Sequence, residues 1–408
     1  MITQNIIADK MVFGGDCIAK IEGKTVFIPY AIPGEELKIE ITDEKRDYAH
    51  AKILEVVKAS PHRINPICPL YTKCGGCNMQ HIDYNFQQKL RVNILKDAFK
   101  RENIELTDVE IIAGNSLGYR SRFQFHNGGL MQRMSNNILS VNNCPVAVKE
   151  INEWLNKTPQ EKRPTGRVHI FGSEKIVEPS GQKVIAAIET QRLVTGKEQE
   201  KAKIKGKRKI KQRFAGTVQN PHNNCTIELL GKKITFDVQG FFQSNLEVLE
   251  KTISAVTEGL GGKNVLDMYA GAGTFSVFLA DLFENVTLVE HNRDALVYAE
   301  QNLSGKKHES FGVSGEKWVL EHAASCIKRN GPFDAVVIDP PRLGMEKAVC
   351  QWLCQSGIKT IHSVSCDIAT HARDAKFLLR AGYKIKKIAL LDFYPQTGHI
   401  ESLCVFEK

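Results

Sequence analysis

Apolar strand patterns alternate with helical patterns from residue 236 to residue 408, and this alternation constrains the fold more than any other feature. It predicts βαβ units and a parallel sheet. The segment KNVLDMYAGAGTF begins with a strand pattern, passes through a glycine-rich turn and continues into an apolar helix pattern. The last two strand patterns instead surround the turn PQTGH, which predicts a terminal antiparallel hairpin. We therefore expect an α/β domain over residues 236–408.

Two further blocks precede this domain in a chain of 408 residues, a length that accommodates about two or three domains. Residues 1–58 contain short apolar segments separated by turn signals such as GG and IPGE, which predict a small β-barrel. Residues 59–235 contain one amphipathic helix pattern, NFQQKLRVNILKDAFKRENI, together with strands and loops. This middle block also holds the most basic stretch of the chain, residues 197–214.

The composition indicates a globular protein with a mild preference for polyanions. Apolar residues make up 42% of the chain and charged residues 25%, and the net charge is +9. No apolar run reaches the length of a membrane span, and the first residues lack a secretory pattern, so we expect a cytoplasmic protein that does not enter membranes. Eleven cysteines in such a chain indicate thiols, metal ligands or catalysis rather than disulfides.

The glycine-rich turn predicts a nucleoside-containing cofactor. Gly271 and Gly273 allow close approach of the backbone to a ligand, and Glu290 ends the next strand pattern, 23 residues after Asp267. An acid at that place accepts hydrogen bonds from ribose hydroxyls. By itself this pattern fits a nicotinamide enzyme almost as well as other nucleoside-binding enzymes. The terminal hairpin decides between them, because in this feature the domain resembles class I S-adenosylmethionine methyltransferases and not dehydrogenases.

Two more candidate residues follow strand patterns. Asp339 ends the strand of FDAVVIDPPRLGM, and Cys366 ends TIHSVS immediately before a helix pattern. Ligands of open α/β sheets bind beyond the carboxyl ends of the strands, so Glu290, Asp339 and Cys366 are expected in one crevice. An isolated cysteine is more often a core residue than a nucleophile. Methylation of uracil carbon 5, however, requires a thiolate at carbon 6 and a base for the carbon 5 proton, and Cys366 with Glu401 meets that requirement.

Five motifs carry a resemblance that extends over nearly the whole chain: QGFFQSN, LDMYAGAGTF, IDPPRLG, VSCDIATHARD and PQTGHIE. In order and spacing they are similar to those of the RNA uracil-5-methyltransferase family. The resemblance implies a Rossmann-like seven-stranded sheet with a terminal antiparallel hairpin, an N-terminal TRAM β-barrel and a central α+β RNA-binding domain. It also implies Cys366 as nucleophile, Glu401 as base and the following S-adenosylmethionine contacts: Gln243, Tyr269, Thr274, Glu290 and Asp339.

One departure from the family pattern concerns the residues after the nucleophile. Asp367 and Ile368 stand where the family usually has Asn-Pro, and a carboxylate beside the thiol is expected to raise its pKa. His399 is an alternative candidate for the base, although a hydrogen-bonded histidine in a turn is at least as common.

Four other cysteines have the spacing of a metal site: Cys68, Cys74, Cys77 and Cys144. Spacing alone permits either a tetrahedral zinc site or a [4Fe-4S] cluster. The family resemblance favours the iron–sulfur cluster, with a structural role. The remaining six cysteines other than Cys366 have no motif around them and are interpreted as structural.

The resemblance also implies RNA as the partner, ribosomal RNA more than transfer RNA, and a monomeric enzyme. The basic residues 197–214 are expected to add phosphate contacts, or else to form a solvated loop. Two other functions remain open. An amino-group methyltransferase also uses a DPP motif, but an aromatic usually follows it, whereas Arg342 stands here. The other is an inactive RNA-binding protein with the same fold.

Overall fold

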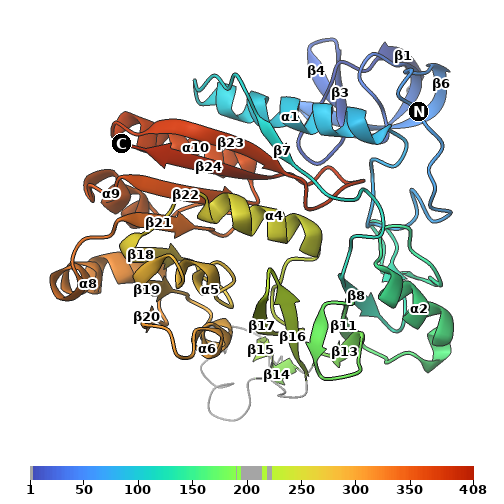
Figure 1. Cartoon of the computed structure of the whole chain (residues 1–408). Coiled ribbons are helices and arrows are strands. Elements are labelled where there is room, and N and C mark those ends of the chain that lie inside the picture. Colours follow the sequence, from blue (N-terminus) through green and yellow to red (C-terminus); the bar gives the residue numbers. More distant parts are fainter. Residues whose placement is uncertain (1–2, 190, 194–213, 218–222) are drawn as a thin grey trace, which may run out of the picture.

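The computed structural model describes residues 3–189, 191–193, 214–217 and 223–408. The basic stretch predicted to contact RNA, residues 197–214, lies outside the described residues except for its last residue. Within the described part of the chain, no helix has the length and apolar character needed to cross a membrane. Figure 1 shows a central α/β unit with the N-terminal strands at one end and the middle block at another.

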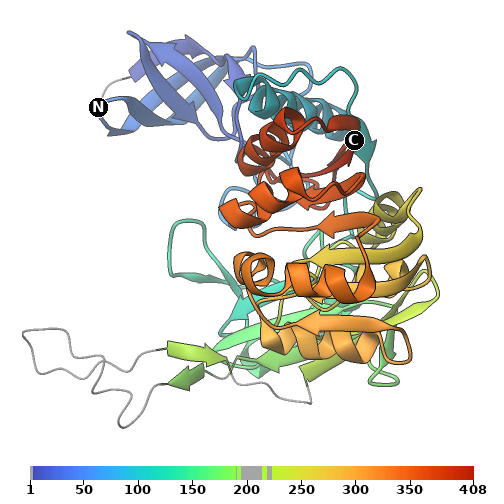
Figure 2. The ribbon, with the colours of Figure 1, turned by 90° about the vertical axis from the view of Figure 1, so that its left-hand side faces the viewer.

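The N-terminal strands form a six-stranded sheet in the order β1-β5-β6-β4-β3-β2, counted over the described residues. Alternate side chains such as Val26, Ile28, Leu37 and Ile39 are buried, as expected for strands that enclose a small core. Figure 2 shows this sheet curving away from the rest of the molecule. The strands are β1 (Thr3–Ile7), β2 (Lys10–Met11), β3 (Cys17–Ile21), β4 (Lys24–Ile28), β5 (Glu36–Glu44) and β6 (Tyr48–Lys58).

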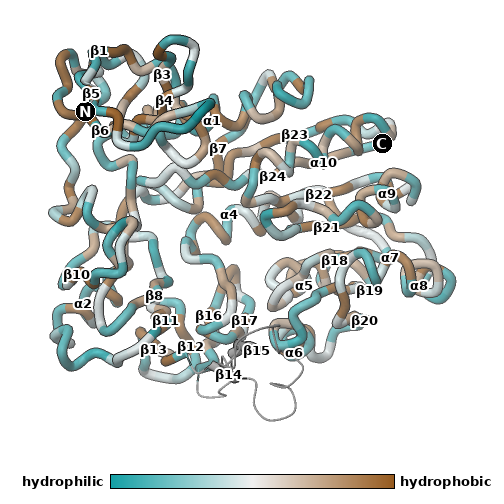
Figure 3. Tube along the Cα trace, turned by 180° about the vertical axis from the view of Figure 1, so that it is seen from behind, coloured by the Kyte–Doolittle hydropathy of each residue, from teal (hydrophilic) through white to brown (hydrophobic). Residues whose placement is uncertain are grey.

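The largest sheet in the described residues has the order β20-β19-β18-β21-β22-β24-β23-β7. Strands β18 to β22 are parallel, and β24 runs antiparallel to both β22 and β23. Strand β21, which lies between β18 and β22, is apolar on both faces, and all four of its residues are buried. Figure 3 shows the hydropathy along the strands of this sheet. The strands are β18 (Gly262–Met268), β19 (Phe283–Val289), β20 (His308–Phe311), β21 (Ala335–Ile338), β22 (Thr360–Ser365), β23 (Lys384–Leu391) and β24 (Glu401–Glu407).

Two elements from the middle block join this α/β unit. The eighth strand of the sheet, β7 (Glu110–Ile112), pairs in parallel with β23. Helix α1 (Tyr84–Arg101) packs against α10 and β23, and lies beside them in Figure 1. The other helices of the unit are α4 (Leu246–Thr257), α5 (Ser276–Leu279), α6 (Arg293–Asn302), α7 (Gly315–Glu321), α8 (Ala323–Asn330), α9 (Lys347–Gln355) and α10 (Ile368–Arg380).

The rest of the middle block forms small antiparallel sheets. One has the order β13-β11-β8 and another the order β12-β16-β17. The first packs against α2 around buried Phe125, Ile151 and Ile170. The elements are β8 (Arg122–His126), β9 (Leu130–Met131), β10 (Ile138–Leu139), α2 (Lys149–Lys157), η1 (Gln160–Lys162), β11 (Arg167–Gly172), β12 (Ile176–Glu178), β13 (Val184–Ile188), β14 (Gln191–Leu193), β15 (Phe214–Thr217), β16 (Asn224–Leu229) and β17 (Lys232–Asp237).

Candidate active site

Cys366 lies where β22 ends and α10 is about to begin. The strand before it is apolar and buried, and Asp367 is the N-cap of the helix after it. The Asp367 carboxylate accepts hydrogen bonds from the backbone N–H groups of Ala369, at 3.1 Å, and Thr370, at 2.9 Å. The unusual residue of the motif therefore has a local role, because it ends the extended backbone and starts α10. This junction places the half-buried thiol at the carboxyl edge of the sheet.

Glu401 is brought to the same edge by the antiparallel pairing of β24 with β22. Ser365 pairs with Ser402, so Cys366 and Glu401 each lie one residue beyond the last paired position. Glu401 is buried, and the side-chain amide of Gln243 donates to its Oε2 at 3.4 Å. Asp339 follows β21, the other neighbour of β22. Gln243, which is predicted to contact the cofactor, therefore also lies against Glu401.

The charges of this cluster affect one another. Burial, followed by the charges of Glu401 and Asp339, raises the pKa of Cys366 to about 11, while Arg342 acts in the opposite direction. Burial, followed by the charge of Asp339, raises the pKa of Glu401 to about 8. Burial and the charge of Glu290 raise the pKa of Asp339 to about 7. A positively charged ligand in the crevice would lower all three values, since it stabilises each anion.

The glycine-rich turn lies beside this cluster, between β18 and α5. Glu290 accepts hydrogen bonds from the backbone N–H groups of Gly271, at 2.8 Å, and Asn292, at 2.6 Å. Gly271 has φ +57°. Gly273 has φ +76°, and a Cβ there would lie 3.0 Å from Ala299 Cβ, so only glycine allows this close packing. The turn and the acid therefore form a preformed unit of the kind that binds a ribose.

Tyr269 and Thr274 flank that turn. Tyr269 immediately follows β18, and its hydroxyl donates to Glu346 Oε2 at 2.7 Å. The tight space around this pair is shared with Gly315, where a Cβ would lie 2.9 Å from the Tyr269 hydroxyl. Thr274 lies in the turn shortly before α5, which begins at Ser276. Along the carboxyl edge of the sheet, Tyr269, Thr274 and Glu290 thus follow β18 and β19, Cys366 follows β22 near Glu401 and Gln243, and Asp339 follows β21 between them.

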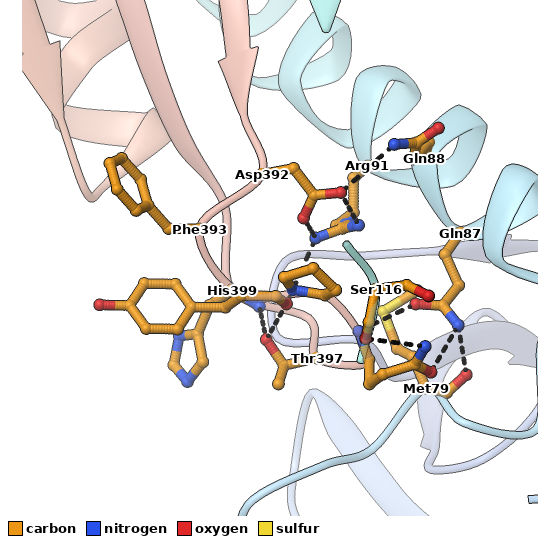
Figure 4. Close-up of polar contacts among 12 residues, drawn as sticks. Met79, Gln87, Gln88, Arg91, Ser116, Asp392, Phe393, Thr397 and His399 are labelled. Carbon is orange, nitrogen blue, oxygen red and sulfur yellow. Dashed lines mark hydrogen bonds and ion pairs between the residues drawn. The ribbon is translucent and has the colours of Figure 1, made fainter. Parts of the chain in front are cut away.

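The turn before Glu401, residues 392–400, is held by α1. Arg91 Nη1 and Nη2 donate to the two carboxylate oxygens of Asp392 at 2.7 and 2.9 Å, and both side chains are buried. Gln87 both donates to Gln396 Oε1, at 2.9 Å, and accepts from the Gln396 backbone N–H, at 3.1 Å. Figure 4 shows these contacts converging on the turn. The turn that precedes Glu401 is therefore held in place by side chains of α1.

Comparison with known proteins gives matches over the two ends of the chain and over its whole length. Residues 5–54 match the TRAM domain model, and residues 326–408 match the tRNA (Uracil-5-)-methyltransferase model. An RNA methyltransferase of Treponema denticola is 36% identical, with 98% of each chain covered. The chain belongs to the RNA uracil-5-methyltransferase family. It is therefore an enzyme of the class that uses S-adenosylmethionine as methyl donor.

Other relatives carry more specific names. The 23S rRNA (uracil(1939)-C(5))-methyltransferase RlmD of Photorhabdus laumondii is 27% identical, with 99% of this chain and 96% of the relative covered. The crystal structure of the Pyrococcus abyssi tRNA (uracil-54, C5)-methyltransferase, in complex with S-adenosyl-L-homocysteine, matches with a TM-score of 0.71 at 22% identity. It covers 98% of this chain and 99% of that one, and confirms the fold.

The four-cysteine motif of this methyltransferase surrounds a cavity of about 350 Å³. Its lining includes Cys68, Cys74, Cys77, Cys144 and the side chain of Arg120. Among the described residues, no three His, Cys, Asp or Glu side chains are close enough to hold a single metal ion. The predicted cluster is therefore not confirmed. The donor set and the cavity nevertheless fit a group larger than one ion, since all four cysteines line the same cavity.

Several residues that shape the site were not found from the sequence. Arg342 was noted only as a non-aromatic residue, although its charge lowers the pKa of Cys366, Glu401 and His399. Arg91 and Asp392 are 301 residues apart, and no sequence pattern links them. The DPPR motif could have indicated Arg342, but nothing in the sequence indicated the pair of Arg91 and Asp392.

Proposed function

We propose that this methyltransferase transfers a methyl group from S-adenosylmethionine to carbon 5 of a uridine in RNA, through a covalent bond between Cys366 and carbon 6. The observation that carries the proposal is the meeting of Cys366, Glu401 and Asp339 at one edge of adjacent strands, beside the turn bearing Glu290. The proposed substrate is 23S ribosomal RNA, because RlmD enzymes align over nearly the whole chain. We further propose that the enzyme acts as a monomer in the cytoplasm.

Each step assigns a role to a residue of the crevice. The Cys366 thiolate bonds to uracil carbon 6, and the displaced electron pair makes carbon 5 nucleophilic. S-adenosylmethionine supplies an electrophilic methyl group on a sulfonium. Carbon 5 takes that methyl group, the sulfur–methyl bond breaks to leave S-adenosylhomocysteine, and carbon 5 then carries both methyl and hydrogen. Glu401 removes the hydrogen as a proton, the ring double bond forms again, and Cys366 leaves as a thiolate.

The surroundings of Glu401 suit a base that acts late. Its pKa of about 8 makes it a stronger base than an exposed carboxylate, because burial disfavours its charge. The Gln243 amide, which donates to Glu401, fixes the direction of the carboxylate. Gln243 Oε1 is buried and has no hydrogen-bond partner in the described structure, so it is free to accept from an N–H of a bound base.

The donor side of the crevice is proposed to hold S-adenosylmethionine. Glu290 would accept hydrogen bonds from its ribose, and Tyr269 and Thr274 lie close to the same turn. The partly buried Asp339, placed between Glu290 and Cys366 along the sheet edge, would stabilise a positively charged group.

The four cysteines that line the second cavity, Cys68, Cys74, Cys77 and Cys144, are proposed to hold a [4Fe-4S] cluster that pins the middle block. Protein purified without oxygen should contain iron and sulfide in near-equal amounts and absorb broadly in the visible range. One zinc per chain would contradict the cluster and leave the methyltransferase proposal intact.

The experiment that tests the mechanism uses Glu401→Gln. This variant keeps the shape but not the base, so it should methylate and then remain attached to RNA through Cys366. A denaturing gel with labelled methyl donor should show a slow-moving protein–RNA band. The band should disappear in the Cys366→Ala/Glu401→Gln double variant and be weak in Glu284→Gln, a matched change at an exposed glutamate. Normal turnover by Glu401→Gln would contradict the assignment and make His399 the next candidate.

The substrate is tested by offering 23S ribosomal RNA and transfer RNA transcripts in separate reactions. Mass-spectrometric mapping of the labelled nucleoside should find 5-methyluridine in the ribosomal fragment. Label in transfer RNA alone would overturn the ribosomal assignment, and label on an exocyclic amine would overturn the reaction.

A further inference from the structure

Asn78, which directly follows Cys77, connects three separate parts of the molecule. Its Oδ1 accepts from the backbone N–H of Gly398, in the turn before Glu401, at 2.9 Å. Its Nδ2 donates to the backbone oxygen of Gly14, in the N-terminal barrel, at 2.6 Å. One side chain thus bonds the barrel, the four-cysteine segment and the catalytic turn together.

The backbone on both sides of Asn78 makes the same connection. The N–H groups of Asn78 and Met79 both donate to the oxygen of Gln396, at 3.1 and 3.0 Å, and Met79 is fully buried. Figure 4 shows Met79 beside the turn. Gly398 is packed against the barrel so closely that a Cβ there would lie 2.3 Å from the carbonyl carbon of Gly14. The contact is therefore direct and leaves no space for movement of either partner.

The turn needs this external support. Gln396 has φ +68°, a conformation that costs a residue other than glycine roughly 1 kcal/mol or more. Within the turn, Thr397 donates to the Tyr394 oxygen and its hydroxyl accepts from the His399 N–H. These local bonds do not involve the Gly398 N–H. Among the described side chains, only Asn78 accepts a hydrogen bond from it.

We propose that Asn78 is a positioning residue, which transmits the placement of the barrel and of the four-cysteine segment to Glu401. Glu401 lies three residues after Gly398 and at the start of β24, so a shift of the turn would move its carboxylate relative to Cys366. This role rests on the proposed function, because it presumes that Glu401 is the base. The physical link between Asn78 and the turn does not depend on that presumption and is tested separately.

The first measurement is hydrogen exchange in the free protein, followed on peptides that span residues 394–400. Asn78→Ala removes both side-chain hydrogen bonds, of which the partly buried one holds the Gly398 N–H, and amides of the turn should exchange about fivefold faster. Asn78→Asp retains the acceptor for Gly398 and loses the donor to Gly14. It should therefore restore slow exchange in the turn, while peptides around Gly14 exchange faster. Lys73→Ala, an exposed change in the same segment, is the control and should alter neither peptide.

The second measurement is the fraction of enzyme bound covalently to RNA at steady state. In Asn78→Ala, proton removal should slow more than methyl transfer, so this fraction should rise several-fold as kcat falls, with KM for S-adenosylmethionine unchanged. A variant that merely folded less well would lose activity without accumulating the adduct. Unchanged exchange in the turn would overturn the positioning role. A different result would instead overturn the proposed mechanism: the turn exchanges faster in Asn78→Ala, but neither Asn78→Ala nor Glu401→Gln accumulates the adduct.

Discussion

The two sides of the catalytic crevice are built in different ways. On the donor side, Tyr269 and Gly271 follow β18 and Glu290 follows β19, two consecutive strands of one βαβ series, so local chain geometry places them. On the uracil side, Cys366 has a local origin, but Glu401 depends on a turn held by α1, the four-cysteine segment and the barrel. A site can therefore combine a half that forms with its own domain and a half that forms only when distant segments dock.

The two sides of the crevice are also stabilised by different kinds of interaction. The turn is fixed by a buried ion pair and by buried amides, which stabilise only while every partner is present. The donor side depends on backbone conformation and on apolar strands. Damage to a remote segment should therefore impair the uracil side first.

The largest expected effect is that of Cys366→Ala. Without the thiolate, carbon 5 is not activated, and kcat should fall roughly a thousandfold or more. Binding of S-adenosylmethionine, measured by calorimetry, should change little because the thiol belongs to the other side of the crevice. Cys354→Ala, a change at a half-buried cysteine of α9, is the control and should retain activity. Substantial turnover by Cys366→Ala would contradict the covalent mechanism.

The second effect concerns the ion pair that holds the turn. Arg91→Leu leaves the Asp392 carboxylate buried without its partner, and the free energy of unfolding should fall by about 3–5 kcal/mol. Urea denaturation measures this change. The double variant Arg91→Leu/Asp392→Leu should lose less, because it leaves no lone charge. Asp97→Ala, which breaks the exposed Lys10–Asp97 pair, should cost less than about 1 kcal/mol. Equal losses for the buried and exposed pairs would refute this view of the turn.

The same difference explains what the sequence could predict. The parallel sheet, the terminal hairpin, the glycine turn and the edge positions of Glu290, Asp339 and Cys366 follow from patterns within short segments. The addition of β7 to the sheet, and the bonds from Gln87, Arg91 and Asn78 to the turn, join residues about 300 positions apart. No periodicity encodes such pairs, because each partner alone resembles an ordinary polar residue.

Two predictions about individual residues also depended on context. Gln243 remains a predicted cofactor contact, and the structure adds a contact that the sequence did not indicate, because its side-chain amide donates to Glu401 Oε2. Asp367 was expected to raise the pKa of the thiol. The structure shows it capping α10, and the carboxylates that raise the pKa of Cys366 are Glu401 and Asp339.

A smaller effect is expected on the donor side. Glu290→Gln keeps one acceptor oxygen but loses the charge that strengthens hydrogen bonds to hydroxyls, so affinity for S-adenosylmethionine should fall about tenfold. Calorimetry with S-adenosylmethionine measures this loss. Glu300→Gln, a change at an exposed glutamate of α6, should leave affinity unchanged. If Glu290→Gln slowed formation of the Cys366–RNA adduct by as large a factor as it weakened binding of S-adenosylmethionine, the two sides of the crevice would not be separable.

The smallest expected effect concerns the influence of the Glu401 charge on Cys366. The negative charge of Glu401 raises the pKa of Cys366, so Glu401→Gln should lower it and increase the thiolate fraction at a given pH. Alkylation of Cys366 by iodoacetamide, quantified on its peptide, should then be roughly threefold faster near pH 9.

The pH at which this difference appears is itself a prediction. Because the pKa of Glu401 is about 8, the wild-type carboxyl is protonated and uncharged at pH 6, as the glutamine is at every pH. Wild type and Glu401→Gln should therefore react alike at pH 6 and separate as pH rises through 8, where the wild-type residue gains its charge. Alkylation of Cys354 in the same samples corrects for reagent and pH. A rate difference that is constant from pH 6 to pH 9 would mean that the substitution acts on access to the thiol and not on its charge.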